Sequence, residues 1–144
     1  MIQVLLDINV ILDVMQKRDE HYEDAAKVMS LCSNNHIKGY IAAINFGTLH
    51  YILSKASGKK TSLSSLKKIR AITAIATVDS KTIDLAIASN FSYFEDAIQY
   101  YSAVQCGLDH IITRNKKDFS KSKLPVSTPK EFLAMFAEVP TKAR

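Results

Sequence analysis

Apolar positions fall into two patterns that alternate along the chain. Four short runs are apolar almost throughout, which is typical of strands buried on both faces of a sheet; they cover residues 2–6, 40–44, 74–78 and 110–113. Between these runs, apolar residues recur every three or four positions, as they do on one face of a helix. The helices are expected to begin near these residues: Asn9, Tyr22, Phe46, Thr61 or Ser62, Ser80, Phe94 and Lys130.

Short buried strands that alternate with helices, with almost no hairpin signals, predict a parallel sheet flanked by helices. We therefore expect an α/β fold of three layers, α/β/α, with a short, mostly parallel central sheet. The length of 144 residues suits a single domain. We place this domain at residues 1–139 and expect residues 140–144 to be a frayed tail.

Composition narrows the class of protein. No apolar run approaches the roughly 20 residues of a membrane-spanning helix, and the N-terminus lacks the features of a secretory signal. Cys32 and Cys106 show no CxxC pairing, so we expect reduced thiols in a cytoplasmic protein. The four histidines have no zinc-ligand spacing. The net charge of +5 favours contact with polyanions, and basic residues gather within residues 55–70 and 114–123.

Polar residues stand where the predicted strands end. In an open α/β sheet, ligands bind at the carboxyl ends of the strands. Asp7 ends the first run, Glu95 and Asp96 open the helix before the fourth run, and Asp118 lies in the loop after it. Oxygen ligands without sulfur or histidine suit Mg²⁺ or Mn²⁺.

Each acid also has a purely structural interpretation. Asp7 lies between two apolar stretches, where a charge buried without a counterion is costly, and this favours a ligand role. Glu95 and Asp96 occupy the first turn of a helix, where the helix dipole favours acids in any case. Asp79 beside Ser80 indicates an ordinary helix start, and Asp13 is expected to be a charge on the outer face of a helix.

Two stretches resemble the signature motifs of the PIN domain family. LLDINVILD is similar to the opening motif, with Asp7 as the first metal-binding acid and Asn9 as its polar companion. YFEDAIQYYSAVQCGLDHIITRNKKDF is similar to the second block, in which Asp96 matches the acid that starts a helix. KRDEHYEDAAKVM and LPVSTPKEFL are typical of one bacterial branch, so the resemblance covers essentially the whole chain.

The resemblance implies hydrolysis of RNA phosphodiester bonds by acids that hold one or two Mg²⁺ or Mn²⁺ ions. The implied catalytic and metal-binding residues are Asp7, Asp96, Asn115 and Asp118. The residues expected to contact the RNA substrate are Asn9, Thr113, Arg114, Lys116 and Lys117. Many bacterial members are toxins of the VapC type, each inhibited by a small antitoxin protein, and members commonly form homodimers.

Two departures from the family pattern leave an alternative open. Thr48 stands where the family commonly has a glutamate, and Asn115 stands where it often has an aspartate. The alternative is a catalytically weakened PIN-like domain that binds RNA or a partner protein. A phospho-receiver would share the fold plan, but it needs adjacent acids after the first strand. Here Asp7 is followed by Ile8, and no lysine closes a fifth strand.

Overall fold

A computed structural model describes residues 1–138 as one parallel sheet with helices on both faces. The strand order is β3-β2-β1-β4-β5, and every neighbouring pair is parallel. The strands are β1 (Gln3–Leu6), β2 (Lys38–Ala42), β3 (Ala74–Ala76), β4 (His110–Ile112) and β5 (Val126–Ser127).

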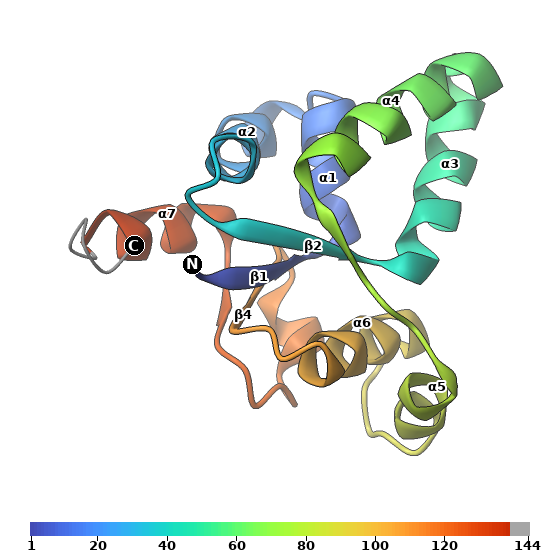
Figure 1. The fold of residues 1–144 in the computed structure, drawn as a ribbon, viewed down its shortest axis with the longest axis vertical. Helices are drawn as coiled ribbons and strands as arrows, with labels where there is room; N and C mark the ends of the chain where they lie inside the picture. Colours follow the sequence, from blue (N-terminus) through green and yellow to red (C-terminus); the bar gives the residue numbers. More distant parts are fainter. Residues whose placement is uncertain (139–144) are drawn as a thin grey trace.

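The helices form two layers on opposite faces of this sheet (Figure 1). The first layer contains α1 (Ile8–Met15), α2 (Asp19–Ser33), α3 (Ala43–Ser57), α4 (Lys59–Ile72) and α7 (Pro129–Glu138). The second contains α5 (Ser80–Ile87), α6 (Phe94–Gln105) and the 3-10 turn η1 (Lys116–Phe119). The expected three-layer α/β/α arrangement is confirmed.

Side chains of β1 alternate between two hydrophobic cores. Val4 and Leu6 pack into the core beneath the first helical layer. Leu5 points to the other face and packs with Tyr100 of α6 and Phe119 of η1. This alternation is the two-residue period of a strand, and it explains why a strand buried on both faces is apolar throughout.

Several boundaries differ from the predicted ones. β2 ends at Ala42, so α3 begins at Ala43, before the expected start at Phe46. The expected loop at residues 57–60 is a single residue, Gly58, whose φ of 86° favours glycine and lets α4 begin at once. The predicted cap at Thr61 or Ser62 is therefore wrong.

Two other local predictions also change. The N-cap of α5 is Asp79 rather than Ser80, and the Asp79 carboxylate accepts a hydrogen bond from the Thr82 amide at 3.0 Å. The piece between Pro125 and Pro129 contains a fifth strand, Val126–Ser127, which pairs with β4. A strand of two residues is too short to show the alternation by which a strand is predicted from sequence.

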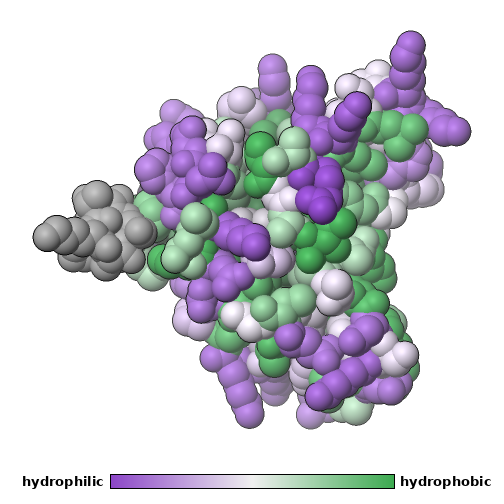
Figure 2. Space-filling model, in the orientation of Figure 1, coloured by the Kyte–Doolittle hydropathy of each residue, from purple (hydrophilic) through white to green (hydrophobic). Residues whose placement is uncertain are grey.

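Hydrophobic side chains reach the surface in several places on the face seen in Figure 2, between areas covered by hydrophilic ones. The exposed large apolar residues of the first layer and the sheet edge include Ile44, Tyr51, Leu63 and Ile75. No helix within residues 1–138 is long and apolar enough to cross a membrane. The predicted domain end at residue 139 and the predicted tail at 140–144 lie outside the described residues.

A close approach between β2 and α2 gives the first prediction. A Cβ added at Gly39 would lie 2.6 Å from Cys32 Sγ and 3.1 Å from Leu6 Cδ1. Because Cys32 is 3% exposed and has little room to move, Gly39→Ala should lower the free energy of unfolding by about 1–3 kcal/mol. Urea denaturation measures this change.

Two matched variants complete this test. A Cβ at Gly47, in the interior of α3, meets nothing within 4 Å, so Gly47→Ala should stabilise the protein by up to about 1 kcal/mol. Adding Cys32→Ala to Gly39→Ala should cost less than the sum of the two single changes. Strict additivity would show that Cys32 is not the obstacle.

Candidate active site

The carboxylate of Asp7 is buried at the end of β1 and held by neutral donors. It is 3% exposed. Gln99 Nε2 donates to Oδ1 at 3.1 Å, while Thr113 Oγ1 and Asn9 Nδ2 donate to Oδ2 at 2.8 Å and 3.5 Å. Burial raises the pKa of Asp7 above its ordinary value, and these hydrogen bonds lower it only in part.

Asp96 meets Asp7 at a shared donor. Asp96 lies in the first turn of α6, and its Oδ1 accepts from the same Gln99 Nε2 at 3.2 Å. Partial burial, followed by the negative charges of Asp7, Asp118 and Glu95, raises the pKa of Asp96 to about 7. The fold therefore brings three other acids within electrostatic reach of Asp96, and Asp7, Asp96 and Asp118 are predicted site residues.

Thr48 lies beside this group of acids. Its Oγ1 donates to Glu95 Oε1 at 3.2 Å. The side chain at the position where the family commonly has a glutamate thus points toward the acids. A carboxylate from α6 is already next to it.

The loop after β4 turns its side chains in different directions. The Thr113 hydroxyl donates to Asp7 and also accepts from the backbone N–H of Asn115 at 3.0 Å. Arg114 donates to Asp13 with Nε at 2.7 Å and Nη2 at 3.2 Å. Lys116 Nζ lies 3.1 Å from Glu131 Oε1 in an exposed ion pair. Two of the predicted RNA-contacting cations are therefore already paired with protein carboxylates.

The prediction that Asp13 is an outer-face charge is wrong. Its side chain is fully buried and is also 3.6 Å from Arg18 Nη1. The face of α1 that carries Asp13 is covered by the loop after β4, from which Arg114 reaches in. A buried carboxylate persists where cationic hydrogen bonds compensate its desolvation.

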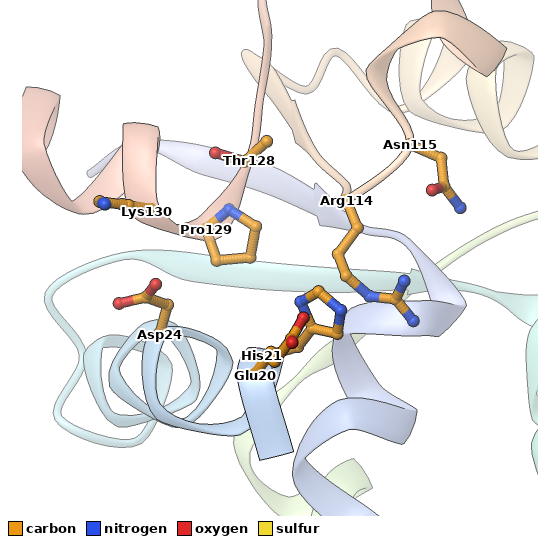
Figure 3. A pocket seen from close by; sticks show the side chains of 8 residues that line it. All are labelled: Glu20, His21, Asp24, Arg114, Asn115, Thr128, Pro129 and Lys130. Carbon is orange, nitrogen blue, oxygen red and sulfur yellow. The ribbon is translucent and has the colours of Figure 1, made fainter. Parts of the chain in front are cut away.

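A cavity of about 500 Å³ lies between α2 and the start of α7. Its lining includes Arg114 and Asn115 but neither Asp7 nor Asp96. Figure 3 shows Arg114 reaching toward His21, with Asn115 at the far end from Asp24 and Lys130. The cavity contains none of the acids around Asp96, so we place the candidate site at those acids and not in the cavity.

Sequence reasoning missed Gln99, and although Asn45 follows the second predicted strand, it was given no role. Gln99 is 1% exposed and Asn45 is fully buried. Asn45 Nδ2 donates to Gln99 Oε1 at 2.8 Å, so the pair connects α3 to the carboxylates. The only signal for Gln99 in the sequence is an amide inside a predicted helix, and an amide on the surface of a helix gives the same pattern.

The donor chemistry of the acids fits a hard divalent cation. The candidate oxygens are carboxylates, and such ligands suit Mg²⁺ or Mn²⁺. A cation would also relieve the repulsion that, after burial, raises the pKa of Asp96. Within residues 1–138 no three His, Cys, Asp or Glu side chains already form a metal-sized group.

Comparisons with known proteins agree on one family. The PIN domain family model matches residues 3–117. Ribonuclease VapC1 of Aquifex aeolicus (strain VF5) is 28% identical over 135 residues, covering 90% of this chain and 92% of that protein.

Solved structures show the same fold at low sequence identity. FitAcB from Neisseria gonorrhoeae superposes with a TM-score of 0.70 at 18% identity, covering 88% of this chain and 98% of that one. A toxin-antitoxin complex from Klebsiella pneumoniae gives a TM-score of 0.65 at 20% identity, covering 88% and 97%.

The raised pKa of Asp96 predicts a pH effect in the metal-free protein. The folded protein keeps this proton up to about pH 7, whereas an ordinary aspartate loses it near 3.8. Between these values Asp96 is protonated in the folded state and ionised in the unfolded chain. The free energy of unfolding therefore falls as the pH rises. Relative to Asp96→Asn, the parent protein should lose stability across this interval.

Urea unfolding in EDTA, at several pH values in that interval, measures the difference. Asp84→Asn removes an acid from an exposed position of α5, and it should keep the parent's pH dependence. Parallel pH profiles for the parent and Asp96→Asn would contradict the prediction.

Proposed function

The chain belongs to the PIN domain family, and we propose that it is an endoribonuclease that hydrolyses RNA phosphodiester bonds with bound Mg²⁺ or Mn²⁺. One observation supports this most directly. The carboxylates of Asp7 and Asp96 converge on one amide nitrogen at the carboxyl end of the central strand. The curated relative with 28% identity is a ribonuclease.

In this proposal, Asp7 and Asp96 would hold the cation, with Asp118 and Asn115 as further ligands. When bound, it would polarise the scissile phosphate and the attacking water. The protein must keep the two carboxylates ionised and correctly oriented. Thr113 is fully buried with its hydroxyl on Asp7, so we assign it to orienting Asp7 rather than to contacting RNA, and we assign Asn9 to the same role.

Substrate contacts fall to the basic loop. Lys116 and Lys117 are exposed in the loop that carries Asp118, and they suit phosphate oxygens, which position RNA without reading its sequence. The ion pair between Lys116 and Glu131 is half exposed on both sides, and such pairs are weak, so a phosphate can replace Glu131. Arg114 is committed to buried Asp13, and we assign it to fixing the loop.

We further propose that the protein is a toxin that pairs with a small antitoxin and forms a homodimer. A toxin-antitoxin complex from Klebsiella pneumoniae shares its fold. Exposed apolar side chains such as Tyr51 of α3 and Leu63 of α4 supply surface that a protein partner would cover.

A second candidate is a weakened PIN domain that binds RNA or a partner without efficient turnover. Within residues 1–138 no three of the neighbouring acids are already spaced to hold a metal ion, and this favours it. So does Thr48, a neutral residue at the position where the family commonly has a glutamate. The two candidates differ in whether RNA is cut.

Removing the charge of Asp96 tests the catalytic role. Asp96→Asn keeps the shape of the side chain but removes a charge that would bind the cation. Cleavage of a structured RNA at saturating Mn²⁺ should fall on the order of a thousandfold, which is about 4 kcal/mol of transition-state stabilisation. Asp84→Asn should cut at the parental rate. Equal cutting by a folded Asp96→Asn protein would remove Asp96 from the site.

Restoring an acid at position 48 tests the weakened alternative. A unit charge about 4 Å from another contributes about 4 kcal/mol at an effective dielectric of 20, and a divalent ion doubles this before desolvation is subtracted. If one or two kcal/mol of this remain, Thr48→Glu should bind Mn²⁺ roughly tenfold more tightly.

Calorimetric titration of Mn²⁺ measures this gain, and Thr48→Gln is the control of equal length without charge. Tighter binding only in the glutamate variant supports a depleted but working cation site. Equal or weaker binding in a folded Thr48→Glu protein would show that Thr48 does not face the cation.

A further inference from the structure

Gln99 connects the two central carboxylates. It is 1% exposed in α6, and its Nε2 lies 3.1 Å from Asp7 Oδ1 and 3.2 Å from Asp96 Oδ1. An amide nitrogen carries two hydrogens, so it can donate one to each carboxylate. This single group therefore joins the end of β1 to the first turn of α6.

The acids fix the orientation of the whole amide chain. An ionised carboxylate only accepts hydrogen bonds, so with Asp7 and Asp96 ionised, Gln99 turns its NH₂ group toward both of them. Its Oε1 then faces α3, where Asn45 Nδ2 donates to it at 2.8 Å. A flipped Asn45 would place two carbonyl oxygens against each other.

The same logic explains an orphaned atom. Asn45 Oδ1 is the buried side-chain polar atom within residues 1–138 that lacks a hydrogen-bond partner. Leaving a buried acceptor unpaired costs stability. Asn45 Oδ1 stays unpaired because the Asn45 NH₂ group must face Gln99 Oε1 to donate its hydrogen bond.

We propose that Gln99, oriented by Asn45, is the positioning residue of this centre, holding the carboxylates of Asp7 and Asp96 together before a cation binds. This rests on the proposed function, in which these carboxylates hold a divalent cation. Gln99 does not touch the cation or the RNA. It acts by opposing the repulsion between two carboxylates that must occupy one small region.

Manganese affinity is the first test. Gln99→Met keeps the length of the side chain and removes both donors. Since loss of a group that orients metal ligands typically costs 10–100-fold in affinity, calorimetry should show at least about tenfold weaker Mn²⁺ binding. Equal affinity in a folded Gln99→Met protein would overturn the proposal.

Gln105→Met is the matched control. Gln105 ends the same helix, and its Nε2 also bridges two acceptors, Asp79 Oδ1 and Thr82 Oγ1. It lies at the cap of α5 rather than at the acids. Its Mn²⁺ affinity should equal that of the parent protein, and a matching loss would mean that any change in α6 weakens binding.

A double-mutant cycle tests whether Asn45 acts through Gln99. Asn45→Leu should weaken Mn²⁺ binding in the parent protein and have no further effect in Gln99→Met. Additive losses would show that Asn45 acts independently, and this would overturn the proposed pair. A purely structural role for either amide would lower stability without this coupling in affinity.

Nuclear magnetic resonance of the metal-free protein separates this proposal from the proposed function. Asp96→Ala should shift the side-chain amide protons of Gln99 and leave those of Gln105 unchanged. Gln99 protons that exchange freely with water and ignore Asp96→Ala would overturn the bridge. A parent protein that binds no Mn²⁺ but shows the Gln99 shift would refute the metal-dependent function and the role of Gln99 in cation binding, leaving only the hydrogen-bonded bridge.

Discussion

The buried carboxylate of Asp7 is the constraint on which the rest of the site depends. Its hydrogen-bond partners, Thr113, Gln99 and Asn9, are all neutral donors, and no Lys or Arg within residues 1–138 pairs with it. Asp13, six residues further along the chain, is equally buried but is matched by two arginines. The protein thus neutralises one buried acid itself and leaves the other to dipoles, which hold an anion less completely than a cation does.

The strand order explains how distant residues reach Asp7. β1 lies between β2 and β4, so the carboxyl ends of all three strands share one edge of the sheet. α3 begins directly after β2 and brings Asn45 and Thr48 to this edge, while β4 ends where Thr113 begins. Helices that connect parallel strands run opposite to them, so the first turn of α6 brings Asp96 to the same edge.

The sequence predicts the residues that interrupt a pattern and misses those that continue one. Asp7 and Thr113 follow apolar runs and Asp96 opens a helix, so their places at strand and helix ends could be inferred. Asn45 follows the second predicted strand, so its place at this edge could be inferred, but its bond to another amide could not. Gln99 lies inside a helix, where an amide suits either solvent or a buried network, and only packing between helices distinguishes the two. Asp13 was misjudged for the same reason, because its helix face is covered by a loop more than a hundred residues away in the chain.

The loop after β4 contacts both buried acids, Asp7 and Asp13. Thr113 donates to Asp7 and the next residue, Arg114, donates to Asp13. Consecutive side chains therefore connect both halves of α1 to the loop after β4, in which Lys116 and Lys117 are exposed. The net charge of +5 overstates the cations free to bind RNA near the acids, because Arg114 is held by Asp13. The Arg114 side chain is therefore not free to bind RNA, but its bond to Asp13 holds the loop in place next to Thr113 and Asp7.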